Sequence, residues 1–207
     1  MVKDPSVPEV VILRLPLYIR ALSQMSEEGQ NVISSKTLGN RLQITPAQIR
    51  KDLSYFGRFG KQGRGYKVDS LIEELTNILG LNRQWNSCIV GVGRLGKAII
   101  NYPGFVPEGF KIISAFDNDP SMIGKTVNEI QILPMDKIKS AVKQNDIKIA
   151  ILAVPATVAQ NVITELLNTN IKAILNYAPI APKVPETLVL RNIDPVLSLQ
   201  SMTYYLD

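Results

Sequence analysis

The sequence predicts an α/β protein: an N-terminal winged-helix domain, then a Rossmann-type doubly wound parallel sheet, with a further helix at the C-terminus. Three observations predict this. The first third is basic and carries two short capped helices before a glycine-rich segment. Strand and helix patterns alternate through the rest of the chain. A G-V-G-R-L-G motif joins the first of those strands to a helix. The expected domains are residues 1–80, 81–192 and 193–207.

Composition narrows the class of protein. The chain has 207 residues, 45% of them hydrophobic, so it can bury a core. No apolar stretch approaches the ~18 residues of a membrane span, and the N-terminus lacks a hydrophobic signal core. The one cysteine, Cys88, falls inside a predicted strand, which suits a small core residue in a reducing compartment. We therefore expect a cytoplasmic protein without a membrane partner.

The net charge of +5 lies entirely in the first third of the chain. Residues 1–70 hold eleven Lys and Arg against six acids, whereas the remaining residues hold twelve of each. Between Arg41 and Lys67 seven bases face a single acid, Asp52. A basic, patterned segment of this kind indicates an interaction with nucleic acid.

The patterning of this segment is that of a helix-turn-helix on a scaffold helix. The scaffold is expected over Val10 to Met25, where Pro16 must start, kink or split it. Ser34 and Ser35 can cap a short helix that runs to Leu42. Thr45 and Pro46 then provide an N-cap and a first-turn proline for a second helix. Its buried face is expected to be Ile49, Leu53 and Phe56, and its outward residues are Gln48, Arg50, Lys51 and Ser54.

A helix with exposed Gln, Arg and Lys suits the DNA major groove, where Arg or Lys can bind guanine and Gln can pair with adenine. The following G-R-F-G-K-Q-G-R-G-Y-K-V reads as a hairpin wing that places bases against phosphates. We expect Arg50 and Lys51 to read base edges. The residues expected to contact double-stranded DNA are Ser35, Thr45, Gln48, Arg50, Lys51, Ser54, Tyr55, Arg58, Phe59, Lys61 and Arg64.

The boundary between the two domains is expected near residues 78–86. A helix over Val68 to Leu79 ends at Gly80, which suits a C-cap, and a short polar link follows. Beyond it, strands rich in Val, Ile and Leu alternate with helices, as in a parallel sheet. The strands are expected over 87–90, 111–116, 148–154, 173–175 and 188–190, and the helices over 134–144 and 157–167, besides one that opens at 97–102.

The glycine-rich turn indicates a dinucleotide site. Gly91 allows a tight turn, Gly93 leaves room for a pyrophosphate, and Gly96 lets the helix pack closely on the strand. The phosphates would then lie on the unpaired amides at the helix N-terminus. The next strand ends in Asp117, 21 residues after Gly96, where an acid should bind the adenosine ribose 2′-hydroxyl. Asp117 predicts NAD(H) in preference to NADP(H).

The last segment predicts a buried helix. Asp194 and Pro195 form an N-cap and first-turn pair. The helix that follows is apolar around most of its surface, so it must lie on its own domain or insert into a partner subunit. Insertion would give a homodimer, which would also provide two winged helices for two half-sites. The apolar residues are Val196, Leu197, Leu199, Met202, Tyr204, Tyr205 and Leu206.

Several motifs together resemble the Rex family of redox-sensing transcriptional repressors. They are R-K-D-L-S-Y-F-G (residues 50–57), the wing, G-V-G-R-L-G (91–96), N-Y-P-G-F (101–105), F-D-N-D-P (116–120), N-Y-A-P (176–179) and the terminal helix. The resemblance spans nearly the whole chain. It implies a homodimer with two winged-helix heads, two Rossmann domains and a C-terminal helix swapped between subunits. The resemblance also implies that the dimer binds a palindromic, inverted-repeat operator, is released by NADH, and binds DNA when NAD⁺ competes for the site.

The resemblance also implies particular roles for residues. Tyr102 corresponds to a tyrosine near the nicotinamide, Asp194 to the aspartate that opens the last helix, and Arg20 to its arginine partner on the other subunit. Pro195 departs from the family, which usually has Leu or Phe there. Together with the glycine turn, the expected NAD(H)-binding residues are Gly91, Val92, Gly93, Arg94, Leu95, Gly96, Tyr102, Asp117, Val154, Pro155, Asn176, Ala178 and Pro179.

Two other classes remain open from the residues. One is an NAD-dependent oxidoreductase with a small accessory domain, although the chain has no histidine to act as the commonest general base. The other is a nucleotide- or CoA-binding module whose basic domain serves oligomerisation and has no DNA role. We expect a protein that is not an enzyme, with no catalytic residue and no metal site.

Overall fold

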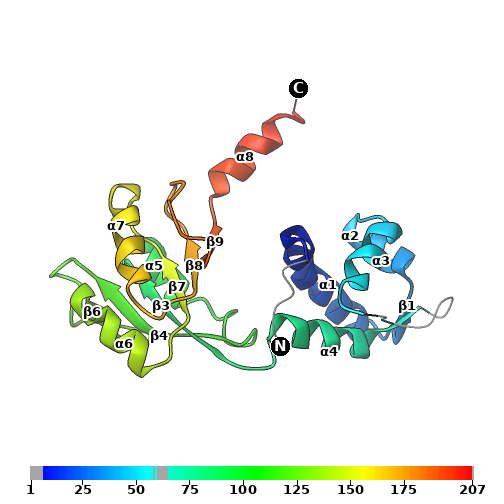
Figure 1. Ribbon diagram of the computed structural model, residues 1–207, viewed down its shortest axis with the longest axis horizontal. Helices are drawn as coiled ribbons and strands as arrows, with labels where there is room; N and C mark the ends of the chain where they lie inside the picture. The colour runs from blue at the N-terminus through cyan, green and yellow to red at the C-terminus, as the bar shows by residue number, and fades with distance from the viewer. Residues whose placement is uncertain (1–6, 58, 60–64, 207) are drawn as a thin grey trace. The chain divides into compact units, whose positions relative to one another are not determined.

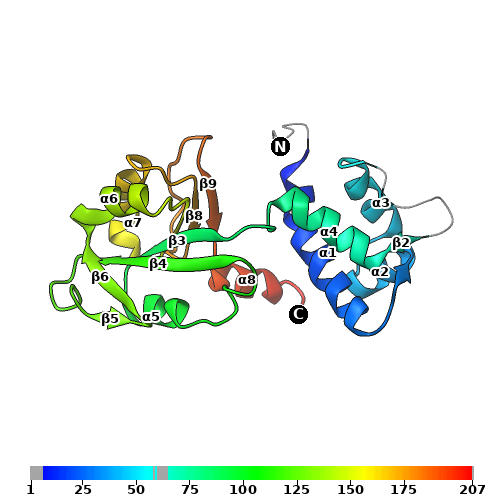
Figure 2. The same ribbon diagram turned by 90° about the horizontal axis from the view of Figure 1, so that it is seen from below.

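The computed structural model of the protein describes residues 7–57, 59 and 65–206 (Figures 1 and 2). The chain divides into two compact units, residues 1–83 and residues 84–207. None of the helices in the described ranges is long and apolar enough to cross a membrane.

The first unit contains four helices and a two-stranded antiparallel sheet among its described residues. The strand β2 (Tyr66–Lys67) lies in the segment expected as the wing, and it pairs with β1 (Val32–Ile33), which precedes the two short helices. This arrangement of helices with a small antiparallel sheet is that of a winged helix. The helices are α1 (Glu9–Glu27), α2 (Ser35–Leu42), α3 (Pro46–Ser54) and α4 (Val68–Leu79).

The expected caps of these helices are present. The Ser34 side chain accepts a hydrogen bond from the Thr37 amide, and Thr45 accepts one from the Gln48 amide. Gly80 ends α4 with a left-handed φ of 71°. Pro16 neither starts nor splits α1, because the helix continues through it from Glu9 to Glu27. The helices share one core of apolar side chains, which includes Leu15, Leu22, Leu38, Ile49, Leu53, Leu71 and Leu75.

The second unit is built on a seven-stranded sheet of order β5-β6-β4-β3-β7-β8-β9. Every neighbouring pair is parallel except β5–β6. The order reverses at β3, so the carboxyl ends of β3, β4 and β7 meet at the topological switch point of a Rossmann fold. The strands are β3 (Trp85–Val90), β4 (Phe110–Asp117), β5 (Thr126–Val127), β6 (Ile130–Pro134), β7 (Ile149–Leu152), β8 (Ala173–Asn176) and β9 (Val189–Asn192).

Alternating side chains of the sheet bury two separate cores. Cys88 and Val90 of β3 pack with α6 (Ile138–Gln144) and α7 (Ala156–Leu167), while Ile89 packs on the other face with α5 (Arg94–Ile100). This alternation is the period of a strand that is covered on both faces. The opposite placement of α5 and α6 can be followed in Figure 2.

Three features differ from the expectations. The strands β5 and β6 were not expected: β5 has only two residues, and β6 has five and runs into Pro134, where a helix was expected to begin. The helix expected over 134–144 begins as a 3₁₀ turn, Met135–Lys137, before α6. The terminal helix α8 (Pro195–Thr203) forms at its expected place, but it buries no residue in this chain. Its apolar side chains Val196, Leu197, Leu199 and Met202 are 56–62% exposed.

Candidate cofactor site and nucleic-acid interface

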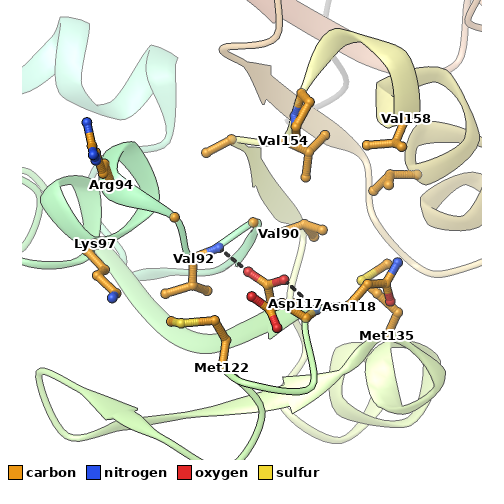
Figure 3. A pocket seen from close by; sticks show the side chains of 16 residues that line it. Val90, Val92, Arg94, Lys97, Asp117, Asn118, Met122, Met135, Val154 and Val158 are labelled. Carbon is orange, nitrogen blue, oxygen red and sulfur yellow. Dashed lines mark hydrogen bonds between the residues drawn. The ribbon is translucent and has the colours of Figure 1, made fainter.

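A cavity of about 550 Å³ opens at the carboxyl ends of β3, β4 and β7. Its size falls in the range of small-molecule sites, and its position is the one at which Rossmann folds bind ligands. Figure 3 shows the side chains that line it. The lining residues are Val90, Gly91, Val92, Gly93, Arg94, Lys97, Asp117, Asn118, Asp119, Met122, Met135, Ala153, Val154, Pro155, Val158 and Val162.

The three glycines of the turn have different surroundings. Gly91 has φ 90°, and a Cβ there would lie 2.5 Å from the Ala153 carbonyl oxygen of the neighbouring strand end. A Cβ on Gly96 would meet the carbonyl of Gly91, so only glycine lets α5 approach β3 this closely. A Cβ on Gly93 would meet no atom within 4 Å. Gly93 therefore leaves open space on the ligand side of the turn, where a pyrophosphate could approach the backbone.

Asp117 ends β4 beside this turn. One carboxylate oxygen accepts a hydrogen bond from the Val92 amide at 2.7 Å, and the other accepts one from the Asp119 amide at 2.9 Å (Figure 3). These two bonds hold the carboxylate against the glycine turn. Each carboxylate oxygen has a further lone pair, so the same group can accept hydrogen bonds from ribose hydroxyls.

The rest of the cavity combines positive charge with apolar surface. Arg94 and Lys97 of α5 line one side, next to the unpaired amides in the first turn of that helix. Met122, Met135 and Val158 contribute apolar side chains elsewhere on the wall. A wall of this kind suits a ligand with an anionic diphosphate and flat, largely apolar rings. NAD(H) fits the residues present.

Seven of the residues expected for the cofactor line the cavity: Gly91, Val92, Gly93, Arg94, Asp117, Val154 and Pro155. Leu95 and Gly96 lie in the first turn of α5 but do not line it. Sequence reasoning missed the other nine lining residues, among them Lys97, Asn118 and Met122. Lys97 directly follows the glycine motif and Asn118 directly follows Asp117, so their positions gave a usable signal, whereas Met122 lies in a loop without a pattern.

Tyr102, Asn176, Ala178 and Pro179 do not line the cavity. Tyr102 follows the end of α5, is 59% exposed, and makes an edge-to-face contact with Phe105. The Asn176 side chain is buried and fully engaged with protein groups. Its amide donates to the Ala178 carbonyl and to the Asn192 side chain, and its oxygen accepts from the Ala178 amide. Asn176 thus shapes the strand end in this chain.

In the first unit, α3 presents Arg50, Lys51 and Ser54 on its exposed face. Arg50 Nη1 donates a hydrogen bond to the Ser35 hydroxyl at 3.0 Å, which joins the start of α2 to α3. Tyr55 is partly exposed at the end of α3, and Thr45 caps its start. Arg58, Lys61 and Arg64 of the expected wing lie outside the described residues.

Two residues expected to contact DNA lie differently from the outward placement that the sequence suggested. Gln48 does not point outward: its side-chain amide donates a hydrogen bond to Asp52 at 2.6 Å and is only partly exposed. The helical i, i+4 spacing brings these two side chains together. Phe59 is partly buried and packs against the core of the unit. Both differences arise because these side chains make contacts within the folded unit that the local sequence pattern does not reveal.

Besides Tyr102, the residues expected to act in the switch are Arg20 and Asp194, which lie towards opposite ends of the chain. Arg20 is exposed on α1. The Asp194 side chain caps α8 by accepting a hydrogen bond from the Val196 amide at 2.9 Å. No group of metal-ligating side chains occurs in the ranges that the structure describes.

Comparison with known proteins agrees with this geometry. Residues 6–54 match the family model described as putative DNA-binding protein N-terminus, and residues 82–180 match that of the CoA binding domain. The redox-sensing transcriptional repressor Rex of Chloroflexus aggregans is 50% identical over 206 residues, covering 100% of this chain and 97% of the relative. The Rex of Carboxydothermus hydrogenoformans is 43% identical, covering 98% and 97%.

Solved structures of similar proteins agree as well. A crystal structure of RSP in complex with β-NAD⁺ and operator DNA has a TM-score of 0.92 at 38% identity, covering 98% of this chain and 94% of that one. A structure of RSP with β-NADH has a TM-score of 0.88 at 36% identity, covering 98% and 95%. A further crystal structure of RSP, a Rex-family repressor, has a TM-score of 0.89 at 36% identity, covering 98% and 95%.

A winged-helix unit joined to a dinucleotide-binding Rossmann unit defines a DNA-binding protein that responds to a nucleotide cofactor. The relatives, which are identical to this chain at up to half of the aligned positions, show to which family of such proteins it belongs. The chain belongs to the Rex family of redox-sensing transcriptional repressors. The expected combination of an N-terminal DNA-binding unit with a Rossmann-type sheet is therefore confirmed. The relatives are transcriptional repressors and not enzymes, as expected, so the oxidoreductase alternative is not supported.

Proposed function

We propose that this chain represses transcription by binding an inverted-repeat operator as a homodimer, and that NADH releases it while NAD⁺ permits binding. The observation that carries the proposal is the Asp117 carboxylate, held against the glycine turn at the switch point of the sheet. A carboxylate at this place accepts the ribose hydroxyls of NAD(H) and repels a 2′-phosphate. CoA bears a phosphate on the same ribose, so its binding is disfavoured in the same way.

The nicotinamide cofactor is better suited to sense the redox state than the cysteine thiol of this chain. Cys88, the single cysteine of the sequence, is fully buried in β3, and burial raises the pKa of its thiol to about 12. A thiol in this state reacts slowly, because the thiolate is the reactive form. The redox signal therefore enters through the nicotinamide cofactor.

The DNA contacts divide by type. Arg50 and Lys51 on the exposed face of α3 would read base edges in the major groove. The wing bases Arg58, Lys61 and Arg64 would bind phosphates, which position the protein without reading sequence. Ser35 would hold Arg50 through the hydrogen bond between them.

The homodimer would form through α8. Its exposed apolar side chains leave a surface that a second copy of the chain can bury. Two winged helices related by a two-fold axis then match the two halves of an inverted repeat. The terminal segment 193–207 is thus an exchanged dimerisation element, and the protein acts in the cytoplasm, where operator DNA is found.

The switch would depend on the charge of the nicotinamide ring. A ligand shifts an equilibrium only by binding the two states differently, and NAD⁺ differs from NADH by a positive charge on this ring. Asp194, at the start of α8, would contact either the cofactor site, next to Tyr102, or Arg20 of the partner subunit. The charge on the nicotinamide ring would thus decide which contact Asp194 makes, and the contact between the subunits would change with it.

The test is to select duplex DNA from a randomised pool with the purified protein and measure its binding by fluorescence anisotropy. We expect an inverted repeat to be selected, NADH to release it, and NAD⁺ to oppose that release. Binding that shows no sequence preference, or release by NADPH in preference to NADH, would contradict the proposal.

A further inference from the structure

The DNA-binding unit contains a buried charged cluster that the cofactor site does not use. Asp52 of α3 is fully buried, and it is the only carboxylate among the described residues that is. Burying a carboxylate is costly unless hydrogen bonds and an opposite charge compensate it. The residue lies directly after Arg50 and Lys51, the two bases on the exposed face of the same helix.

The partners of Asp52 come from two helices. From α1, Arg14 donates two hydrogen bonds, its Nε at 2.5 Å and its Nη2 at 2.7 Å, and the Tyr18 hydroxyl donates a third at 2.5 Å. From α3 itself, Gln48 Nε2 donates a fourth at 2.6 Å. Burial alone would raise the pKa of Asp52, but the bonds from Arg14, Tyr18 and Gln48 outweigh it and hold the pKa below its ordinary value. The carboxylate is therefore charged and saturated.

This cluster fixes the rotation of α3 about its own axis, which apolar packing alone does not determine. Ile49 and Leu53 hold the helix against the core, but apolar contacts are non-directional. Hydrogen bonds to a carboxylate are directional, and the fork of Arg14 fits both oxygens at once. Because each helical residue advances by a fixed angle, fixing Asp52 also fixes the directions in which Arg50 and Lys51 leave the helix.

We propose that Asp52 is a positioning residue for sequence recognition: held by Arg14 and Tyr18 of α1, it sets the rotation of α3 and so the aim of Arg50 and Lys51. Gln48 belongs to this network and does not read a base itself. The inference rests on the proposed base-reading role of α3. It differs from a purely stabilising role of Asp52, in which any variant that folds would keep its sequence preference.

The mildest test is Gln48→Ala, which removes one donor from a helix position that tolerates alanine. Operator duplexes with each base pair replaced in turn are measured against wild-type protein and the variant. We expect the operator preference over a scrambled duplex to fall about tenfold, spread over all base pairs read by α3, because a lost hydrogen bond to a charged group has this magnitude. A loss confined to one base pair would show that Gln48 is a reader and overturn the proposal.

The second test measures the operator preference of two variants. Asp52→Asn removes the charge of the carboxylate, and the double variant Arg14→Met/Asp52→Leu replaces the buried pair by apolar side chains. Such replacements can preserve stability. We expect the double variant to fold, to bind NADH and scrambled DNA as wild type does, and to show at least about a tenfold lower operator preference. A stable double variant with full preference would overturn the proposal. The matched control is Glu28→Gln, which breaks the exposed ion pair with Arg41 in the same unit and should leave the preference unchanged.

A failure of this inference can be told from a failure of the proposed function. If wild-type protein prefers no duplex sequence, the base-reading role itself is wrong. If wild-type protein selects an operator and the variants retain that selectivity, only the positioning role of Asp52 is wrong.

Discussion

Replacing Asp117 by alanine should weaken NADH binding far more than NADPH binding. The carboxylate sits between the amides of Val92 and Asp119, at 2.7 and 2.9 Å, with its remaining lone pairs available to the ribose. Hydrogen bonds to a charged group contribute about 1.5–3 kcal/mol, so losing this acceptor should raise the Kd for NADH about 10- to 150-fold. NADPH loses no such bond and is relieved of repulsion between the carboxylate and its 2′-phosphate, so its affinity should hold or rise.

The assay is a titration of cofactor fluorescence with wild type, Asp117→Ala and the control Asp136→Ala. Asp136 is an exposed carboxylate of the 3₁₀ turn before α6 that does not line the cavity, so its loss should change neither affinity. Wild-type protein that prefers NADPH, or an Asp117→Ala protein that loses both cofactors equally, would refute the reasoning.

Four further predictions concern the DNA-binding helix, the terminal helix, the glycine turn and the buried Asp52. Arg50→Ala should cost about 1–3 kcal/mol of operator binding and relax sequence preference, measured by anisotropy, whereas wing variants should weaken all DNA alike. Removing residues from Pro195 onward should abolish a clean dimer in sedimentation. Gly96→Ala should abolish NADH binding, because its Cβ would meet the Gly91 carbonyl. The depressed pKa of Asp52 means that its network stabilises the fold above an unfolded Asp pKa of about 3.9 and loses this as pH falls through the folded value. Asp52→Asn should therefore flatten the acid limb of a stability curve, measured by thermal unfolding between pH 2 and 5.

The elements with local signals could be predicted from the sequence. Capping residues such as Ser34 and Thr45 act within one turn of their own helix, so their pattern identified α2 and α3. The glycine turn and Asp117 are read from spacing alone, because the Rossmann fold places consecutive strand ends together. These signals supplied the fold class and the part of the cofactor site nearest to β3 and β4.

The remainder depended on contacts between distant segments. The burial of Asp52 requires Arg14 and Tyr18, which lie more than 30 residues away, so its neighbours in sequence gave no sign of it. For the same reason Gln48 was expected to face DNA. The apolar surface of α8 could be read from the sequence, but a single chain does not contain what covers it.

The central claim is that NADH and operator DNA oppose each other on one protein, and reciprocal binding tests it most directly. The Kd for NADH is measured by calorimetry with the free protein and with the protein saturated by its selected operator, and the Kd for the operator is measured with and without NADH. Linkage requires that both ratios be the same factor, because coupling free energy is shared by the two ligands. We predict that the operator weakens NADH binding by the factor by which NADH weakens operator binding. An NADH affinity that is unchanged by saturating operator would contradict the account.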